Sequence, residues 1–393
     1  MNLILHIGAE KTGTTSFQYW LQENYNQLYQ NNIYVSKSLG QPANNKLVAY
    51  CHDFSSGNHN FLNCNINNKK ELENFRTKLK EEFEKELSEL PKNSISTYII
   101  SSEFLQSLLL KEEMVERAKN FLQSYFSNIL VICFLRPHVD VLLSLLSTMS
   151  AAGHIIDVAS FDADKNDVYF DYLALYRRWK SCFDNFCFVS YKKNNNIVDY
   201  FKILLGVDDT EFADVGRRNS ALDYRMIALR NNILPMPLSA RKTLLDRREF
   251  LEGKPAKYPL TVSLAQARVV HARFRRQITQ LVRECEDLTL DDLTPDWNRF
   301  PERGNIERVE EVVFKPQLQY VLMRLNAELW VERARANLAE AKLASMNGNT
   351  VRAGQLVAHC NDCIANARQL GIRELSEKCD LIQQHCEKLS DQI

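Results

Sequence analysis

A strand, a glycine-bounded turn and a helix follow one another at residues 3–18, and this order constrains the fold more than any other feature. The apolar run LILHIG is typical of a buried strand and ends at Gly8. Gly13 follows after four intervening residues, one of which is Lys11. The expected helix then opens on three hydroxyl side chains, Thr14, Thr15 and Ser16. This spacing is typical of a loop whose backbone N–H groups turn toward an anion at a helix start.

The same loop departs from the pattern that binds nucleoside triphosphates. That pattern places Lys and then Ser or Thr directly after the second glycine, and the hydroxyl ligates magnesium. Here Thr14 and Thr15 follow Gly13, and Lys11 precedes it. We therefore expect a phosphate group held by the lysine, the hydroxyls and the helix start, without a metal ion.

Short apolar runs alternate with helical patterns along the first half of the chain. The runs are LILHIG, STYIISS, NILVICFLR and FCFVSY, and the last follows the helix-like segment YFDYLALYRRWKSCF. Alternation of this kind predicts an α/β fold with a mainly parallel sheet flanked by helices. From about residue 217 the pattern becomes helical. We expect an α/β domain at residues 1–310 and an all-α extension at 311–393.

Composition excludes several classes of protein. Lys plus Arg and Asp plus Glu number 49 each, so the near-zero net charge argues against a chain that mainly coats nucleic acid. The N-terminus runs directly into the first strand, and no apolar run approaches the length of a membrane span. Ten cysteines in such a chain indicate reduced thiols and a cytoplasmic setting.

The segment VICFLRPHVDVLLSLLS predicts a second anion site. Arg136 lies at the carboxyl end of a buried strand, Pro137 begins a helix, and Ser144 follows eight residues after Arg136. The carboxyl ends of parallel strands share one edge of the sheet, where Gly8 and Ser102 also fall. A guanidinium and a hydroxyl at this edge would hold a second phosphate.

Together the two motifs resemble those of sulfotransferases that use 3′-phosphoadenosine-5′-phosphosulfate (PAPS). IGAEKTGTTSFQ is similar to the family's 5′-phosphosulfate loop, and RPHVDVLLS to its 3′-phosphate element. The resemblance covers roughly residues 1–300 and implies a P-loop-like fold, PAPS as donor, the bisphosphate PAP as product and no required metal. By this resemblance Lys11 is catalytic, Gly13 and the three hydroxyl residues bind the 5′-phosphate, and Arg136 and Ser144 bind the 3′-phosphate.

Further nucleotide contacts rest on the same resemblance. VSYKK is similar to a strand end whose tyrosine packs near adenine, which indicates Tyr191. RRNSAL is similar to a basic segment after the last strand, so that Arg217 or Arg218 would reach the 3′-phosphate. A core position for the tyrosine and a solvated turn for the arginines are the alternatives.

An acceptor hydroxyl needs a general base. Glu103 lies just past a strand end, where family members carry a catalytic His or Glu, and it is the first choice. His52, in the loop YCHDFSSGNH, is the rival. Glu103 would otherwise complement a helix start. Glu10 would contact the acceptor or hold Lys11, and the sequence does not choose between these roles.

The last 80 or so residues predict two Ala-rich amphipathic helices joined by Asn-Gly-Asn, and a third helix after them. They resemble a tetratricopeptide hairpin but form too few repeats for a solenoid, so they would pack on the catalytic domain or on another subunit of a homo-oligomer. A set of thiols and one imidazole invites a zinc interpretation, but helical spacing favours packing: Cys360, Cys363, Cys379, His385 and Cys386.

The sequence thus predicts a sulfotransferase acting on a hydroxyl or an amine of a saccharide or small natural product. A nucleotide-dependent kinase is one alternative, but it requires a lysine after Gly13. A non-catalytic scaffold built on the C-terminal helices is the other, and it leaves the two anion motifs unexplained.

Overall fold

The structure is a computed structural model of the 393-residue chain. It describes residues 1–54, 61, 64–91, 94–162, 167–194, 196–207, 212–215, 221–233, 258–311 and 316–392. The chain divides into two compact units. Unit 1 comprises Met1–Leu145, Phe161–Ser220 and Val262–Arg303, and unit 2 comprises Leu146–Ser160, Ala221–Thr261 and Gly304–Ile393. The domain division expected at residue 310 cuts the chain differently and stays a prediction.

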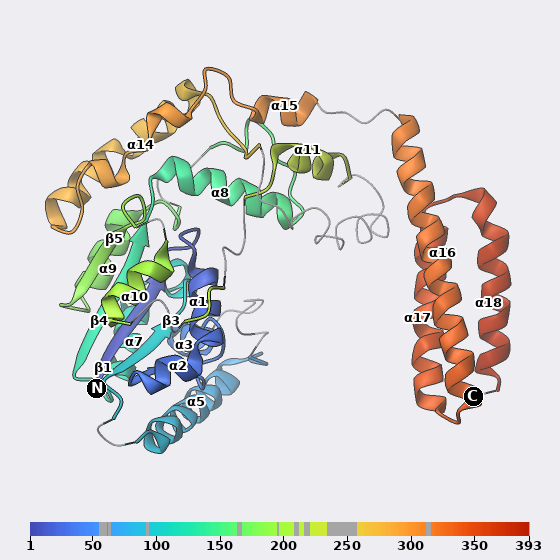
Figure 1. Ribbon diagram of the computed structural model, residues 1–393, viewed down its shortest axis with the longest axis horizontal. Coiled ribbons are helices and arrows are strands. Elements are labelled where there is room, and N and C mark those ends of the chain that lie inside the picture. The colour runs from blue at the N-terminus through green and yellow to red at the C-terminus, as the bar shows by residue number, and fades with distance from the viewer. Residues whose placement is uncertain are drawn as a thin grey trace. The chain divides into compact units, whose positions relative to one another are not determined.

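Unit 1 contains one five-stranded sheet in which every pair of neighbours is parallel. The strand order is β2-β3-β1-β4-β5 (Figure 1). The strands are β1 (Asn2–Gly8), β2 (Ile33–Val35), β3 (Thr97–Ser101), β4 (Asn128–Leu135) and β5 (Phe186–Ser190). Four of them confirm the predicted runs, and β2 was not predicted. Strand β1 lies at the centre, so the loop that follows it emerges in the middle of the carboxyl edge.

Helices connect and flank the strands in unit 1, and unit 2 also contains helices. In chain order they are α1 (Thr14–Glu23), α2 (Tyr25–Gln30), α3 (Asn45–Cys51), α5 (Lys69–Glu89), α6 (Phe104–Leu108), α7 (Glu112–Gln123), α8 (His138–Ala151), α9 (Tyr172–Lys180), α10 (Ile197–Leu205), α11 (Tyr224–Ile233), α14 (Leu264–Glu284), α15 (Ile306–Glu311), α16 (Pro316–Met346), α17 (Thr350–Gln369) and α18 (Ser376–Ser390). Three short 3₁₀ turns lie at Asp291–Leu293, Trp297–Arg299 and Arg373–Leu375.

Helices α1 and α10 cover one face of the sheet with aromatic side chains. Phe17 of α1 stacks on Phe201 of α10 with ring centres 3.9 Å apart, and both are fully buried. His6 of β1 packs edge-on against both rings. Burial lowers the pKa of His6 to about 3, so this core imidazole is neutral at physiological pH. Helix α1 is thereby fixed on the sheet directly behind the loop.

The opposite face carries a buried carboxylate. Glu86 of α5 accepts hydrogen bonds from the Tyr98 hydroxyl at 2.5 Å and from the backbone N–H groups of Lys37 and Ser38 at 3.1 and 2.5 Å. These donors belong to β3 and to the segment that leaves β2. Because a buried carboxylate is stable only when its oxygens are hydrogen-bonded, Glu86 ties this segment to the sheet.

In unit 2, α16, α17 and α18 form a helical bundle with its own apolar core (Figure 1). These helices confirm the three that the sequence predicted. Cys360 donates a weak hydrogen bond through Sγ to the carbonyl of Ala334 at 3.1 Å, and Cys386 Sγ lies 3.1 Å from Cys360 Sγ. The four cysteines of the bundle are buried in this core, which agrees with their expected role as small packing residues.

We expect Glu86→Ala to lower the free energy of unfolding by about 3 kcal/mol, because the buried Tyr98 hydroxyl and two backbone N–H groups lose a charged acceptor. Urea denaturation followed by tryptophan fluorescence measures this change. Glu81→Ala is the matched control, since Glu81 lies exposed on the same helix, and it should stay within about 0.5 kcal/mol of the parent. Equal effects of the two substitutions would contradict the role given to Glu86.

Candidate functional site

The loop between β1 and α1 turns through left-handed backbone conformations. Gly8, Lys11 and Gly13 have φ values of 116°, 67° and 90°. Glycine adopts such angles freely, but at Lys11 they cost on the order of 1 kcal/mol. Arg136, at the end of β4, donates from Nη1 to the carbonyl oxygen of Lys11 at 2.7 Å. This bond joins the two motifs that the sequence predicted to lie at one edge.

The hydroxyl residues expected to hold a phosphate begin α1. Gly13 is the N-cap and Thr14 the first helical residue, and no side chain caps this helix start. The first backbone hydrogen bond of the helix runs from Phe17 N–H to the Gly13 carbonyl at 3.2 Å. The N–H groups of Thr14, Thr15 and Ser16 therefore precede the helical ladder, and the positive end of the helix dipole lies there.

Glu103 packs directly against the end of β1. A Cβ atom at Gly8 would lie 3.3 Å from Glu103 Cα and 3.4 Å from its carbonyl oxygen. The backbone N–H of Ser102 also donates to the carbonyl of His6 at 2.9 Å. The candidate base is thus held against the loop through backbone contacts, in which Gly8 permits the close approach.

Two carboxylates flank the lysine of the loop. Burial lowers the pKa of Lys11, whereas the charges of Glu10 and Glu103 raise it. Burial raises the pKa of Glu10, and the charge of Glu103 adds to that rise. Gln18 of α1 donates from Nε2 to Glu103 Oε2 at 2.5 Å, and the Tyr169 hydroxyl lies 3.4 Å from Glu10 Oε2.

Several of these partners were not assigned from the sequence. Gln18 lies one helical turn after Thr14, and this spacing on α1 was the only local signal for its position near the loop. Tyr169 comes from the segment before α9 and is 159 residues away from Glu10 in the chain. Nothing in the sequence pairs two residues at such a separation.

The predicted 3′-phosphate element contains an acidic residue that sequence reasoning missed. The guanidinium carbon of Arg136 lies 4.8 Å from the centre of the Tyr191 ring, a cation–π contact. Asp140, in the first turn of α8, forms an ion pair with Arg299. Burial raises the pKa of Asp140, while Arg299 and Arg136 oppose that rise. Ser144 lies one turn further along α8 and is half-buried.

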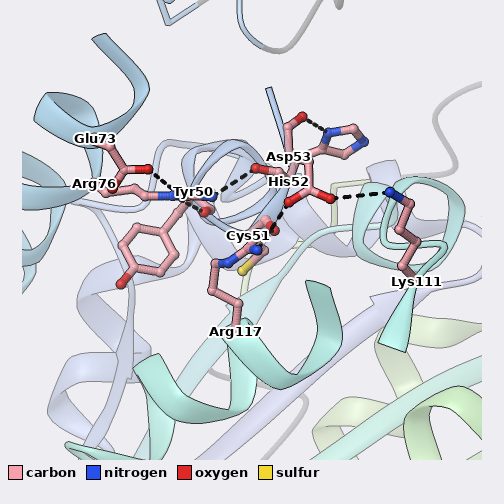
Figure 2. A network of polar contacts seen from close by, with 8 residues as sticks. All are labelled: Tyr50, Cys51, His52, Asp53, Glu73, Arg76, Lys111 and Arg117. Carbon is pink, nitrogen blue, oxygen red and sulfur yellow. Dashed lines mark hydrogen bonds and ion pairs between the residues drawn. The ribbon is translucent and has the colours of Figure 1, made fainter. Parts of the chain in front are cut away.

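His52 belongs to a different network, which Figure 2 shows at the end of α3. Its Nδ1–H donates to the carbonyl of Asp53 at 2.7 Å, and its own carbonyl accepts from Arg76 at 3.0 Å. The Asp53 carboxylate binds Arg117 at 3.1 Å and Lys111 at 3.4 Å. Although burial opposes the shift, these two cations lower the pKa of Asp53. The contacts cap the carboxyl end of a helix, a structural task.

A pocket of about 400 Å³ lies beside the segment that connects β2 to α3. Asn45 lines it and accepts a hydrogen bond from the Ser102 hydroxyl at 3.0 Å. Lys46 and Glu82 also line it and form an ion pair at 3.0 Å. One wall of this pocket is therefore hydrogen-bonded to the residue that precedes Glu103.

Arg217 and Arg218 lie outside the described residues. Within the described part of the chain, no cluster of three or more His, Cys, Asp or Glu side chains is arranged to hold a metal ion. No helix there combines the length and the apolar character needed to cross a membrane. No protein-family model, curated protein or solved structure matches the chain.

We expect Gly8→Ala to destabilise the protein by about 2 kcal/mol, because the new Cβ meets the Glu103 backbone at an unfavourable φ. Gly354→Ala provides an opposite control. Gly354 lies within α17 with open space around its Cα, so alanine should stabilise by about 0.5–1 kcal/mol. Thermal denaturation of both variants checks the signs, and an unchanged melting temperature for Gly8→Ala would contradict the proposed close approach.

Proposed function

We propose that this chain is a sulfotransferase that transfers a sulfuryl group from PAPS to a hydroxyl or an amine of a saccharide or small natural product. The observation that supports this most is the hydrogen bond from Arg136 to the Lys11 carbonyl. It links the lysine-containing loop at the start of α1 to an arginine at the end of β4, which neighbours β1 in the sheet. Two separated phosphates of one nucleotide would require such a pair of sites.

The residues of the site fit such a donor in their chemistry. The N–H groups and hydroxyls of Thr14, Thr15 and Ser16 would hold the 5′-phosphate at the start of α1. A guanidinium has five N–H donors, of which the bond to Lys11 uses one, so Arg136 retains capacity for the 3′-phosphate beside Ser144. In this proposal Tyr191 holds the guanidinium on its ring face and borders the adenine.

Positioning and charge would dominate the chemistry. The bound donor supplies a sulfuryl group whose transfer leaves negative charge on the departing phosphate. Lys11 would neutralise that charge, and its left-handed backbone, fixed by Arg136, would aim the ammonium group. The carboxylates at Glu10 and Glu103 favour the charged form of Lys11 and so oppose the effect of its burial.

The acceptor would enter from the side of Glu103. The pocket beside β2 offers amide, lysine and carboxylate side chains together with the ring of Phe75, a mixture typical of sites that bind sugars or other polar small molecules. The hydrogen bond that Asn45 of this pocket accepts from the Ser102 hydroxyl connects the pocket to the residue before Glu103. We therefore assign the acceptor's remote part to this pocket.

Calorimetric titration with PAP tests the donor site. We expect metal-independent binding of PAP by the parent chain and weak binding of ATP with magnesium. Lys11→Ala should weaken PAP binding roughly 10- to 100-fold, because a charged hydrogen bond to phosphate contributes about 1.5–3 kcal/mol. Lys85→Ala, on the exposed side of α5, is the control and should bind as the parent does. Preference for ATP with magnesium would instead indicate a kinase.

Transfer assays test whether proton transfer depends on the carboxylates beside Lys11 or on the His52 network. Glu103→Gln should slow transfer about a hundredfold with PAP affinity nearly unchanged, because it removes a carboxylate beside the reacting groups. His52→Ala should change the rate by no more than a few-fold, since the contacts of His52 cap α3. Formation of PAP from PAPS measures both rates. A large loss in His52→Ala alone would move the base to the α3 network.

A further inference from the structure

We propose that Glu10 is the catalytic residue that accepts the acceptor's proton, and that Glu103 is a positioning residue that holds Glu10 and Lys11 in place. This inference rests on the proposed function and moves the proton-accepting role from Glu103 to Glu10. It is carried by the different surroundings of the two carboxylates. Glu103 accepts a hydrogen bond from the side-chain amide of Gln18, whereas Glu10 faces the Tyr169 hydroxyl.

Glu103 is held by its surroundings. Its Oε2 accepts the 2.5 Å hydrogen bond from Gln18, and its backbone packs on Gly8. Glu103 is also the N-cap residue of α6. A carboxylate that accepts a short bond from an amide is held in position. Such a group is suited to fix the positions of its neighbours.

Glu10 has the surroundings of a proton acceptor. It lies in the loop next to Lys11 and is half-buried. The groups that face it are Lys11 on its own loop, Glu103 and Ser107 from α6 and its N-cap, and Tyr169 from the segment before α9. Tyr169 and Ser107 are neutral, so a single lysine faces two carboxylates.

This charge balance makes Glu10 more basic than an ordinary glutamate. Burial raises its pKa first, and the Glu103 charge raises it further, while Ser107, Lys11 and Tyr169 oppose these effects. A carboxylate whose pKa moves toward neutrality is a better base at physiological pH than one with an ordinary pKa. The Glu103 charge thus acts on the reaction through Glu10.

Atoms and electrons balance in the proposed sulfuryl transfer. The acceptor oxygen or nitrogen forms a bond to sulfur while the bond from sulfur to the phosphate oxygen breaks. The bonding electron pair stays on the phosphate beside Lys11. The proton of the acceptor passes to a carboxylate oxygen of Glu10 and later leaves to water.

Proton-linked PAP binding tests the assignment without any acceptor. The phosphates of PAP bring negative charge beside Glu10, so binding should raise its pKa further and draw in a fraction of a proton. Calorimetry of PAP binding in two buffers of different ionisation enthalpy measures that uptake. We expect uptake by the parent chain, a clearly smaller uptake by Glu10→Gln, and no change in the exposed control Glu81→Gln.

Melting temperatures supply a second readout with a definite sign. Because the folded-state pKa of Glu10 is raised, its ionised form costs stability above that pKa, and the cost disappears as the pH falls through it. Glu10→Gln should therefore melt higher than the parent at neutral pH, and the two should converge in mild acid. A purely structural glutamate would give the opposite sign, with the variant melting lower.

Hydrolysis of PAPS by water shows the consequence for the reaction. In the parent the hydrolysis rate should fall in acid as Glu10 becomes protonated, which gives the pH–rate profile an acid limb. Glu10→Gln should lose this acid limb, and its rate at neutral pH should be about a hundredfold lower. Glu103→Gln should keep the limb but move it to lower pH, because it removes a charge that raises the pKa of Glu10.

The outcomes distinguish this inference from the proposed function. If the parent binds PAP but takes up as much proton as Glu10→Gln, and the two melt alike, Glu10 is not the base while the donor site stands. If Glu103→Gln rather than Glu10→Gln abolishes the proton uptake, the two roles are reversed. If the parent binds no PAP, the proposed function itself fails.

Discussion

The close approach of Gly8 to the backbone of Glu103 is the contact on which the site depends. It brings the end of the central strand against the end of β3, where a side chain at position 8 would intervene. The loop after β1 must then turn through the left-handed conformations of Lys11 and Gly13 to reach the start of α1. The two carboxylates and the lysine are neighbours because these backbones touch.

A continuous series of hydrogen bonds supports this contact from one side of the sheet. Glu86 of α5 holds the segment after β2, and Asn44 in that segment accepts a bond from Ser101 N–H at 2.8 Å. Asn45 then accepts the bond from the Ser102 hydroxyl. Residues on rigid elements, fixed by bonds to a second layer, can hold a site to within a fraction of an ångström. The position of Glu103 therefore depends on residues that face away from the loop.

Local sequence patterns predicted the elements of this fold well, and their pairwise contacts poorly. Strands β1, β3, β4 and β5 are apolar runs with polar flanks, which the pattern identifies directly. Strand β2 has three residues, Ile33–Val35, and too short a run to show any period. Strand ends also placed Lys11, Glu103 and Arg136 at one edge, because parallel strands share it.

Contacts between segments that are distant in the chain could not be predicted from the sequence. The bond from Gln18 to Glu103 spans 85 positions, and the ion pair of Arg299 with Asp140 spans 159. His52 lies in a segment predicted as a loop, and Arg76 from α5 donates a hydrogen bond to its carbonyl. Such pairs arise from packing of whole helices, so no spacing along the chain encodes them.

The charges of the site show why a second carboxylate matters. Glu10 and Glu103 together outweigh Lys11, which is unfavourable beside an incoming polyanion. The imbalance is relieved whenever one carboxylate takes up a proton, and Glu10, half-buried and facing the fixed charge of Glu103, takes it up more readily than an exposed glutamate. Binding of an anion and protonation of Glu10 would then favour each other, since each reduces the cost of the other. In this proposal the charges of the site couple donor binding to the protonation state of Glu10, and only the fraction of Glu10 that stays ionised can accept the acceptor's proton.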